Sequence, residues 1–131
     1  MSATRTIPAP HIEEETRPFW DGLKEGALRV KFCNSCNSFH HYPRSICPHC
    51  GSDDTVYKDS NGRGHIYSFS VFRAAPIPYA IAYVTLEGTD ISLMTNIVNC
   101  DFDTLAVGQA VKVCFVETED GGAPVAMFEP A

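Results

Sequence analysis

Short runs of alternating apolar and polar residues follow one another from residue 65 to residue 128, rich in β-branched and aromatic side chains. This period of two predicts strands. We expect five of them, at residues 65–73, 79–86, 91–98, 111–117 and 125–128. Glu87–Asp90 and Gly121–Gly122 provide turn signals for two hairpins, and Asp101 and Gly108 bracket a single helical turn after the third strand. This order is that of a five-stranded OB-fold barrel, although the pattern alone leaves other small barrels open.

A helical pattern is expected near the N-terminus, where Thr16 suits an N-cap, Pro18 a first turn and Gly26 a stop. Four apolar residues fall on one face of this short helix: Phe19, Trp20, Leu23 and Ala27. Two interpretations of this face stay open. It either packs on the chain's own ribbon or barrel, or its aromatic residues dock on a partner.

Four cysteines carry the most specific chemistry of the chain, in the spacing Cys33-x2-Cys36-x10-Cys47-x2-Cys50. Two Cys-x-x-Cys turns brought together by a hairpin place four sulfurs on one tetrahedral metal ion, with no open position for a substrate. Disulfides are disfavoured, because residues 1–10 do not resemble a secretory leader and a reducing compartment keeps thiols free. Iron also fits a four-sulfur shell. We favour one structural zinc ion in a ribbon too small to fold without it.

The residue after each cysteine pair supports this interpretation. Gly51 follows the second pair and Asn37 the first, where such a turn commonly needs a positive φ that Gly and then Asn tolerate best. Three histidines lie in the same segment: His40, His41 and His49. Four cysteines already saturate the ion, so we expect the histidines to be surface or supporting contacts and not ligands.

The chain divides into three parts at these signals. Residues 28–32 alternate as a strand that leads into the first cysteine turn, and residues 39–44 return toward the second. Residues 53–64 are polar and contain the turn Ser60-Asn61-Gly62, so the module boundary is placed there. We therefore expect an N-terminal arm with a short helix at 1–26, the zinc ribbon at 27–59 and the OB-fold at 60–131. Residues 1–15 are expected to be mobile or to order on a partner.

Composition limits the function classes. A chain of 131 residues with 44% hydrophobic content is enough for one ordered domain or two small modules. With 10 Lys+Arg against 16 Asp+Glu, the net charge of -6 opposes binding to nucleic acid or another polyanion. The longest apolar stretch, residues 79–86, is too short to span a bilayer. We expect a cytoplasmic protein that does not associate with a membrane.

Catalytic motifs are not found in the sequence. There is no Gly-x-Ser-x-Gly elbow, no His-Glu-x-x-His and no phosphate-binding Gly-rich loop before a helix. Cys114 alternates with apolar neighbours in a predicted strand, and Cys100 has no neighbouring His or Lys in the sequence. Both are expected to be inert thiols, and the protein is expected not to be an enzyme.

Several motifs occur in an order that resembles a known family. They are Phe-Trp-x-Gly-Leu at 19–23, the first Cys-x-x-Cys, Tyr42-Pro43-Arg44, Cys47-Pro48-His49-Cys50-Gly51-Ser52, Gly-x-Ile-Tyr-Ser-Phe at 64–69, Thr95-Asn96-Ile97-Val98 and residues 107–113. In this order they resemble the acyl-CoA-associated proteins that combine an N-terminal rubredoxin-like zinc ribbon with a C-terminal OB-fold. The match covers nearly the whole chain beyond Thr16. Asn37 departs from the family's more usual Gly.

The resemblance implies a non-catalytic accessory subunit in a hetero-oligomer. Members of the family associate with thiolase-like condensing or retro-aldol enzymes, or with hydratases, that act on acyl-CoA thioesters, and they help to form the acyl-CoA site. Nucleic-acid binding is the principal alternative, since zinc ribbons and OB-folds also occur in such proteins. It is disfavoured because only Arg63, Arg73 and Lys112 lie in the barrel among acidic residues. A small iron electron carrier is disfavoured by the attached barrel.

The loop between the first two predicted barrel strands is apolar throughout, with the sequence Ala74-Ala75-Pro76-Ile77-Pro78. A surface loop is normally polar, so this one is expected to cover something. Either it packs on the chain's own ribbon, or Pro76, Ile77 and Pro78 contact acyl-CoA or a partner, because this loop commonly lines the OB-fold binding face. Arg73 at its foot would then meet a coenzyme A phosphate or a partner carboxylate.

Overall fold

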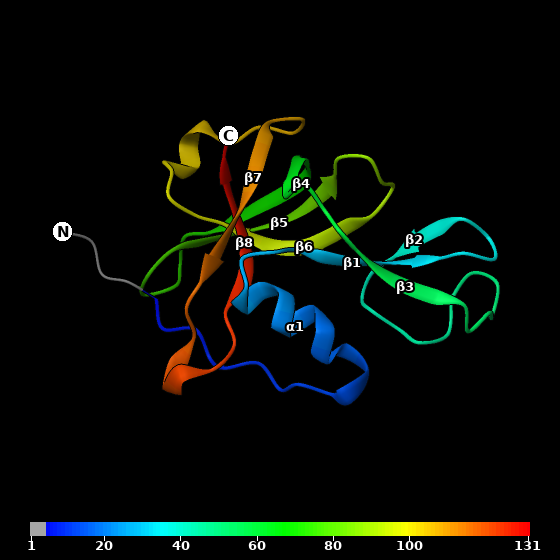
Figure 1. The fold of residues 1–131 in the computed structure, drawn as a ribbon. Coiled ribbons are helices and arrows are strands. Elements are labelled where there is room, and N and C mark those ends of the chain that lie inside the picture. Colours follow the sequence, from blue (N-terminus) through cyan, green and yellow to red (C-terminus); the bar gives the residue numbers. More distant parts are fainter. Residues whose placement is uncertain (1–4) are drawn as a thin grey trace.

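The computed structural model describes residues 5–131 and places two sheets next to each other, with the smaller one extending to one side of a barrel (Figure 1). The barrel is closed in the strand order β4-β5-β6-β8-β7. Its strands are β4 (Arg63–Phe72), β5 (Tyr79–Leu86), β6 (Ser92–Ile97), β7 (Ala110–Val116) and β8 (Val125–Pro130). A parallel contact between Ile97 and Phe128 closes it. A five-stranded closed barrel in this order is an OB-fold, as expected.

The barrel strands alternate as their sequence predicts. On β5, Ala80, Ala82 and Val84 are buried inside the barrel, while Ile81 and Tyr83 point outward. Between β6 and β7, the expected single helical turn is present as a short 3-10 helix at Phe102–Thr104. The Asp101 carboxylate accepts a hydrogen bond from the Asp103 N–H at 2.9 Å, so the expected cap is present.

The ribbon is a three-stranded sheet in the order β2-β1-β3. Its strands are β1 (Arg29–Cys33), β2 (Ser38–His40) and β3 (Thr55–Asp59). Strand β3, which was not predicted, lies within the polar stretch 53–64, ends before the expected boundary turn at 60–62 and pairs antiparallel with β1. The reason is cross-strand packing: Lys31 lies 4.3 Å over the Tyr57 ring, and Lys58 lies 3.9 Å over the Phe32 ring. The expected return strand at 39–44 is also shorter, ending at His40.

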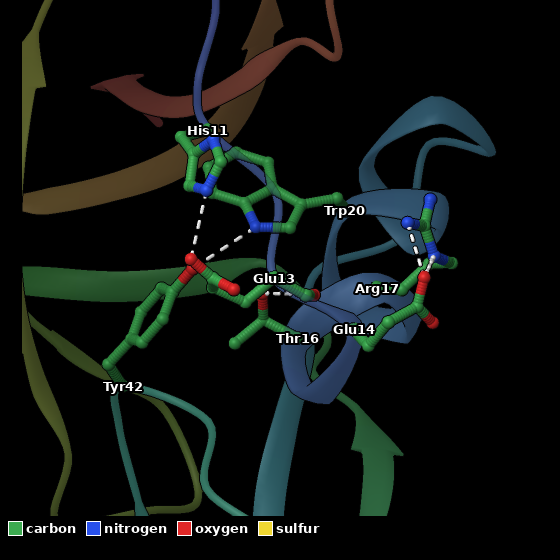
Figure 2. A network of polar contacts seen from close by, with 7 residues as sticks. All are labelled: His11, Glu13, Glu14, Thr16, Arg17, Trp20 and Tyr42. Carbon is green, nitrogen blue, oxygen red and sulfur yellow. Dashed lines mark hydrogen bonds and ion pairs between the residues drawn. The ribbon is translucent and has the colours of Figure 1, made fainter.

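Helix α1 (Arg17–Lys24) uses its apolar face within the chain. Phe19 and Leu23 are 5% and 2% exposed and belong to the same buried cluster as the barrel core. Trp20 is half-buried, and its indole N–H donates to the Tyr42 hydroxyl at 3.1 Å (Figure 2). Thr16 precedes the helix as predicted, but it makes no cap, because its hydroxyl donates to the Glu13 carbonyl instead. Of the two interpretations of this face, the structure supports packing within the chain.

The N-terminal segment runs beneath the barrel in the view of Figure 1 and ends at α1. Residues 1–4 of the expected arm lie outside the described residues. In the rest, the Glu119 N–H donates to the Ile7 carbonyl at 2.8 Å, and the Tyr57 hydroxyl donates to the Glu15 carbonyl at 3.0 Å. Residues 5–15 therefore contact both barrel and ribbon, whereas the sequence predicted an arm that is mobile or orders on a partner. No helix in residues 5–131 is long and apolar enough to cross a membrane.

Candidate functional site

Two matching turns present the four cysteines. The first begins where β1 ends at Cys33, and the Asn37 N–H donates to the Cys33 carbonyl at 2.8 Å. In the second, the Gly51 N–H donates to the Cys47 carbonyl at 2.9 Å. Asn37 and Gly51 have φ angles of 55° and 79°, which confirms the left-handed conformation predicted for both. No atom lies within 4 Å of a Cβ built on Gly51, so backbone conformation alone favours glycine there.

The four sulfurs lie at the spacing of a tetrahedral metal shell. The Sγ atoms of Cys33 and Cys50 are 3.6 Å apart, and those of Cys36 and Cys47 are 3.7 Å apart. All four Sγ atoms lie within 4.8 Å of one another. A tetrahedron with Zn–S bonds of about 2.3 Å has sulfurs about 3.8 Å apart, whereas a disulfide needs about 2.05 Å. The donor set therefore fits one structural zinc ion.

Polar contacts hold the two turns against each other. The Ser35 and Ser52 hydroxyls are 2.7 Å apart, and the Asn34 amide donates to the Asp54 carboxylate at 3.1 Å. The His49 N–H donates to the Cys47 sulfur at 3.4 Å, which places negative charge next to a donor. The cluster in residues 5–131 with metal-ligand spacing contains the four cysteines and no histidine. His40 is buried instead, with its Nε2 3.3 Å from the Arg44 carbonyl.

His41 lies in an apolar setting between the ribbon and α1. Its ring centroid is 5.5 Å from that of Phe19 and 5.5 Å from that of Tyr42. Burial, with a smaller contribution from the charge of His40, lowers the pKa of His41 to about 4. The ring is therefore neutral at pH 7 and packs as an apolar side chain.

A second feature is a pocket of about 620 Å³ at one end of the barrel. This volume lies in the range of small-molecule sites. Its lining comes from the loop between β4 and β5, from the segment that follows β6 and from the N-terminal segment. The lining residues are Arg5, Ile7, Arg73, Ile77, Pro78, Tyr79, Ile97, Val98, Asn99, Cys100, Asp101, Phe102, Val116 and Met127. Most of these are apolar, so the pocket suits an uncharged chain or ring.

Two guanidinium groups lie at this pocket. Arg73 forms an ion pair with Asp103 at 2.6 Å, and the Arg5 guanidinium carbon lies 4.1 Å over the Tyr79 ring. The side chains of Arg73 and Asp103 are 61% and 74% exposed, so water screens their attraction and the pair is weak. Arg73 can therefore exchange Asp103 for an anionic group of a ligand at little cost.

The structure brings together part of what the sequence singled out. Arg73, Ile77 and Pro78 line the pocket, whereas Pro76 is exposed and does not. Sequence reasoning missed Arg5 and Ile7, because an acidic, proline-containing segment gave no sign of packing. It also did not identify residues 97–102 as one wall of the pocket. The Asp101 cap signal, which fixes the turn after β6, was the available clue.

The two cysteines outside the ribbon are poor nucleophiles. Burial and the nearby Glu129 raise the pKa of Cys114 to about 11. Burial and the charge of Asp101 raise the pKa of Cys100, although this thiol reaches the pocket. Both therefore stay protonated at neutral pH.

A four-cysteine zinc ribbon followed by an OB-fold barrel defines the class of this protein. Comparison with family models gives the same two parts in the same order. Residues 20–56 match "ChsH2, rubredoxin-like zinc ribbon domain", and residues 57–116 match "ChsH2, C-terminal OB-fold domain". The chain belongs to the ChsH2 family.

Relatives with curated names include two hydratase alpha subunits and a scaffold protein. The chain is 32% identical, over 95% of its length, to the "Probable enoyl-CoA hydratase alpha subunit" of Thermomonospora curvata, and covers 40% of that protein. It is 29% identical, over 85% of its length, to the "3-oxo-4,17-pregnadiene-20-carboxyl-CoA hydratase alpha subunit" of Mycobacterium tuberculosis, covering 37% of it. A "DUF35 domain-containing scaffold protein" of Methanothermobacter thermautotrophicus is 29% identical over 69% of this chain and 72% of its own. The chain thus spans about two fifths of the two hydratase subunits.

Solved structures share the arrangement. A chain of the "Ltp2-ChsH2(DUF35) aldolase" superposes with a TM-score of 0.79 at 28% identity, over 92% of this chain and 98% of that one. A DUF35-family protein from Sulfolobus solfataricus superposes with a TM-score of 0.66 over 90% of this chain and 86% of its own, at 17% identity. The second shows the fold alone.

Proposed function

We propose that this chain is an accessory subunit that associates with a thiolase-like or hydratase enzyme acting on acyl-CoA thioesters. The observation that carries the proposal is the superposition on nearly the full length, 98%, of a chain from an aldolase assembly at a TM-score of 0.79. The relatives named as hydratase alpha subunits, of which this chain covers 40% and 37%, support the same association. In this role the chain stabilises its partner and helps to form the acyl-CoA site.

The chain is proposed to contribute no catalytic group. The relative named as a scaffold protein supports this role. The raised pKa values of Cys100 and Cys114 support it too, since neither thiol is an activated nucleophile. A four-thiolate metal site needs cysteines that are kept from oxidation, and we place the protein in the cytoplasm, where such sites persist.

Zinc is proposed to be held by Cys33, Cys36, Cys47 and Cys50. The sulfur spacing and the chemistry of four thiolates support this assignment. A filled tetrahedral shell has no position for substrate, so the ion stabilises the ribbon and takes no part in the partner's reaction.

The pocket beside the loop between β4 and β5 is proposed to take part of the acyl-CoA thioester. Ile77 and Pro78 offer apolar walls to an uncharged pantetheine arm, and Arg73 offers a guanidinium to a phosphate. Pro76 lies outside the lining of the pocket and is therefore proposed to contact the partner. The alternative that the loop only covers the chain's own ribbon is not supported, since its lining partners belong to the barrel and the N-terminal segment.

Affinity purification from the native cell tests the proposal. We expect the chain to retain an acyl-CoA enzyme of thiolase-like or hydratase type, which mass spectrometry would identify. The isolated chain should not turn over acyl-CoA. Recovery without such a subunit, or turnover by the chain alone, would overturn the proposal.

The pocket is tested in the purified complex with the substitution Ile77→Asp. It should weaken partner binding or acyl-CoA turnover at least about tenfold, with zinc content and melting temperature nearly unchanged. Val107→Asp, at a side chain 70% exposed outside the pocket, is the matched control. An Ile77→Asp complex as tight and as active as the control would exclude the loop between β4 and β5 as a contact for acyl-CoA or the partner.

A further inference from the structure

Beyond Arg63 at the start of β4, three neighbouring barrel strands carry an outer face without Asp, Glu, Lys or Arg. Residues 65–72, 79–86 and 92–97 contain no Asp, Glu, Lys or Arg, although 20% of the whole chain is charged. The strands β4, β5 and β6 pair directly along this face. Depletion of charge together with Tyr and Met is typical of the centre of a protein interface and not of a solvated surface.

Several large, mostly apolar side chains on this face are exposed to solvent. Tyr67 is 64% exposed and Met94 63%, and Tyr83 between them is 42% exposed. Tyr83 pairs with Met94 across β5 and β6 and with Ser68 across β4 and β5, so these side chains form one row. Tyr67 projects at the β-bulge between Ile66 and Ser68, where the register shifts.

A second row lies beside the first and contains a hollow. Ile81 pairs with Ser70 on β4 and with Asn96 on β6, and it is 38% exposed. A cavity of about 200 Å³ opens here, lined by Ser68, Phe69, Ser70, Ile81, Ala82 and Tyr83. A hollow of this size and lining has room for one large apolar side chain, the kind of contact that anchors the centre of many interfaces.

We propose that this face is where the chain seats its partner subunit, which presents an uncharged surface with one projecting large apolar side chain. The inference rests on the proposed function, because it identifies the surface to which the partner of an accessory subunit binds. The chemistry of the face selects this occupant. A polyanion or an acidic membrane would need Lys or Arg across this face, and residues 65–72, 79–86 and 92–97 offer none.

The face continues into the pocket described above. Tyr79 lines the pocket and also packs edge-on against Phe72, with ring centroids 5.5 Å apart. Phe72 is 48% exposed and pairs with Tyr79 at the end of β4 and β5. A subunit seated on the face therefore reaches the pocket mouth, so that a ligand in the pocket lies at the boundary between the two proteins.

Charge placed on the face tests the proposal. The subunit retained by the wild-type chain is purified, and its Kd is measured by calorimetry for Tyr83→Glu, Met94→Glu and the control Val107→Glu. Val107 is 70% exposed and lies outside the three strands. We expect the two face variants to raise Kd at least tenfold and the control to stay within twofold. Zinc content and melting temperature are measured for each to establish folding.

A photoreactive benzoylphenylalanine in place of Met94 tests the same point without adding charge. It should crosslink to the partner subunit, whereas the same group in place of Val107 should not. If the wild-type chain retains its subunit but the face variants bind as tightly and position 94 does not crosslink, the face is excluded and the proposed function stands. If no acyl-CoA enzyme is retained, both proposals fail. A dimer of the chain alone that Tyr83→Glu dissociates in sedimentation would assign the face to a second copy and overturn the inference.

Discussion

The cysteine turns of the ribbon and the core of the barrel are stabilised in different ways. In the turns, Cys33 and Cys47 are buried among exposed neighbours and almost no apolar side chain joins them. In the barrel, Ile66, Val84 and Phe128 are each 0% exposed within one continuous apolar cluster. The turns are therefore expected to depend on metal ligation, whereas the barrel depends on the burial of apolar surface.

The ribbon and the barrel nevertheless pack into one apolar cluster where they meet. Leu28 and Val30, at the root of the ribbon, are 2% and 1% exposed and belong to the barrel's cluster, as does Leu23 of α1. The border between the part stabilised by metal and the part stabilised by the apolar core therefore lies inside the ribbon, and not between the two sheets. Loss of the metal should release the cysteine turns while the root of β1 stays packed.

The largest effect is expected when the metal shell is broken by Cys33→Ser. Structural zinc supplies a free energy of about 10–16 kcal/mol to such folds, so the variant should lose zinc. Hydrogen exchange should show lost protection at the amides of Asn37 and Gly51. The amide of Val113, which donates to the Gly62 carbonyl, should stay protected. Cys114→Ser is the control and should keep one zinc ion. Full zinc and an unchanged melting temperature in Cys33→Ser would disprove the four-sulfur shell.

Truncation of a core side chain should have the opposite result, with lower stability of the barrel and no loss of zinc. Phe128→Ala removes a fully buried ring from the barrel and should lower the free energy of unfolding by about 3–5 kcal/mol. Phe72→Ala, at a ring 48% exposed, should change it by less than about 1 kcal/mol. Urea unfolding gives both values, and elemental analysis should find one zinc ion in each folded variant. Zinc loss from Phe128→Ala below its unfolding transition would show that the turns do not ligate metal independently of the barrel.

Acid should destabilise the contact between ribbon and helix through His41. Burial lowers its folded-state pKa to about 4, while in the unfolded chain the pKa is about 6.5. The unfolded state therefore binds the proton first as the pH falls below about 6.5, and stability decreases down to about pH 4. Between pH 7.5 and 5.5, the wild type should lose about 1 kcal/mol more unfolding free energy than His41→Gln, measured in urea with zinc content monitored. Equal losses in both proteins would show that His41 is not the group responsible.

The smallest effect concerns the bond between Trp20 of α1 and Tyr42 of the ribbon. Tyr42→Phe removes the hydroxyl that accepts the indole N–H and should cost about 0.5–1 kcal/mol, since Tyr42 is 42% exposed. Trp20 is the single tryptophan, so its fluorescence reports the change directly. Tyr67→Phe, on the outer barrel face, should leave emission and stability unchanged. A similar shift in both variants would mean that this bond has no specific effect.

Local patterns were sufficient wherever a short segment fixes its own geometry. The cysteine spacing predicted the four-sulfur cluster because each turn is closed by a hydrogen bond across four residues, with Asn37 and Gly51 in the left-handed conformation. The barrel strands were predicted because each buries every second residue, and alternation is visible in the sequence. The loop after β4 was also identified, since an apolar surface loop is unusual by itself.

Partners distant in the sequence decided what local patterns could not. Strand β3 is stabilised by stacking of Lys31 on Tyr57 across the sheet, and the N-terminal segment by a bond from Glu119 to Ile7, contacts that no local period encodes. The pocket likewise joins Arg5, Ile77 and Phe102 from three separate segments. The sequence by itself determined the metal cluster and the barrel, because turn geometry and strand alternation are properties of neighbouring residues. Only the tertiary structure decided the pocket and the outer face of β4, β5 and β6, because each exists only when distant strands pair in one register.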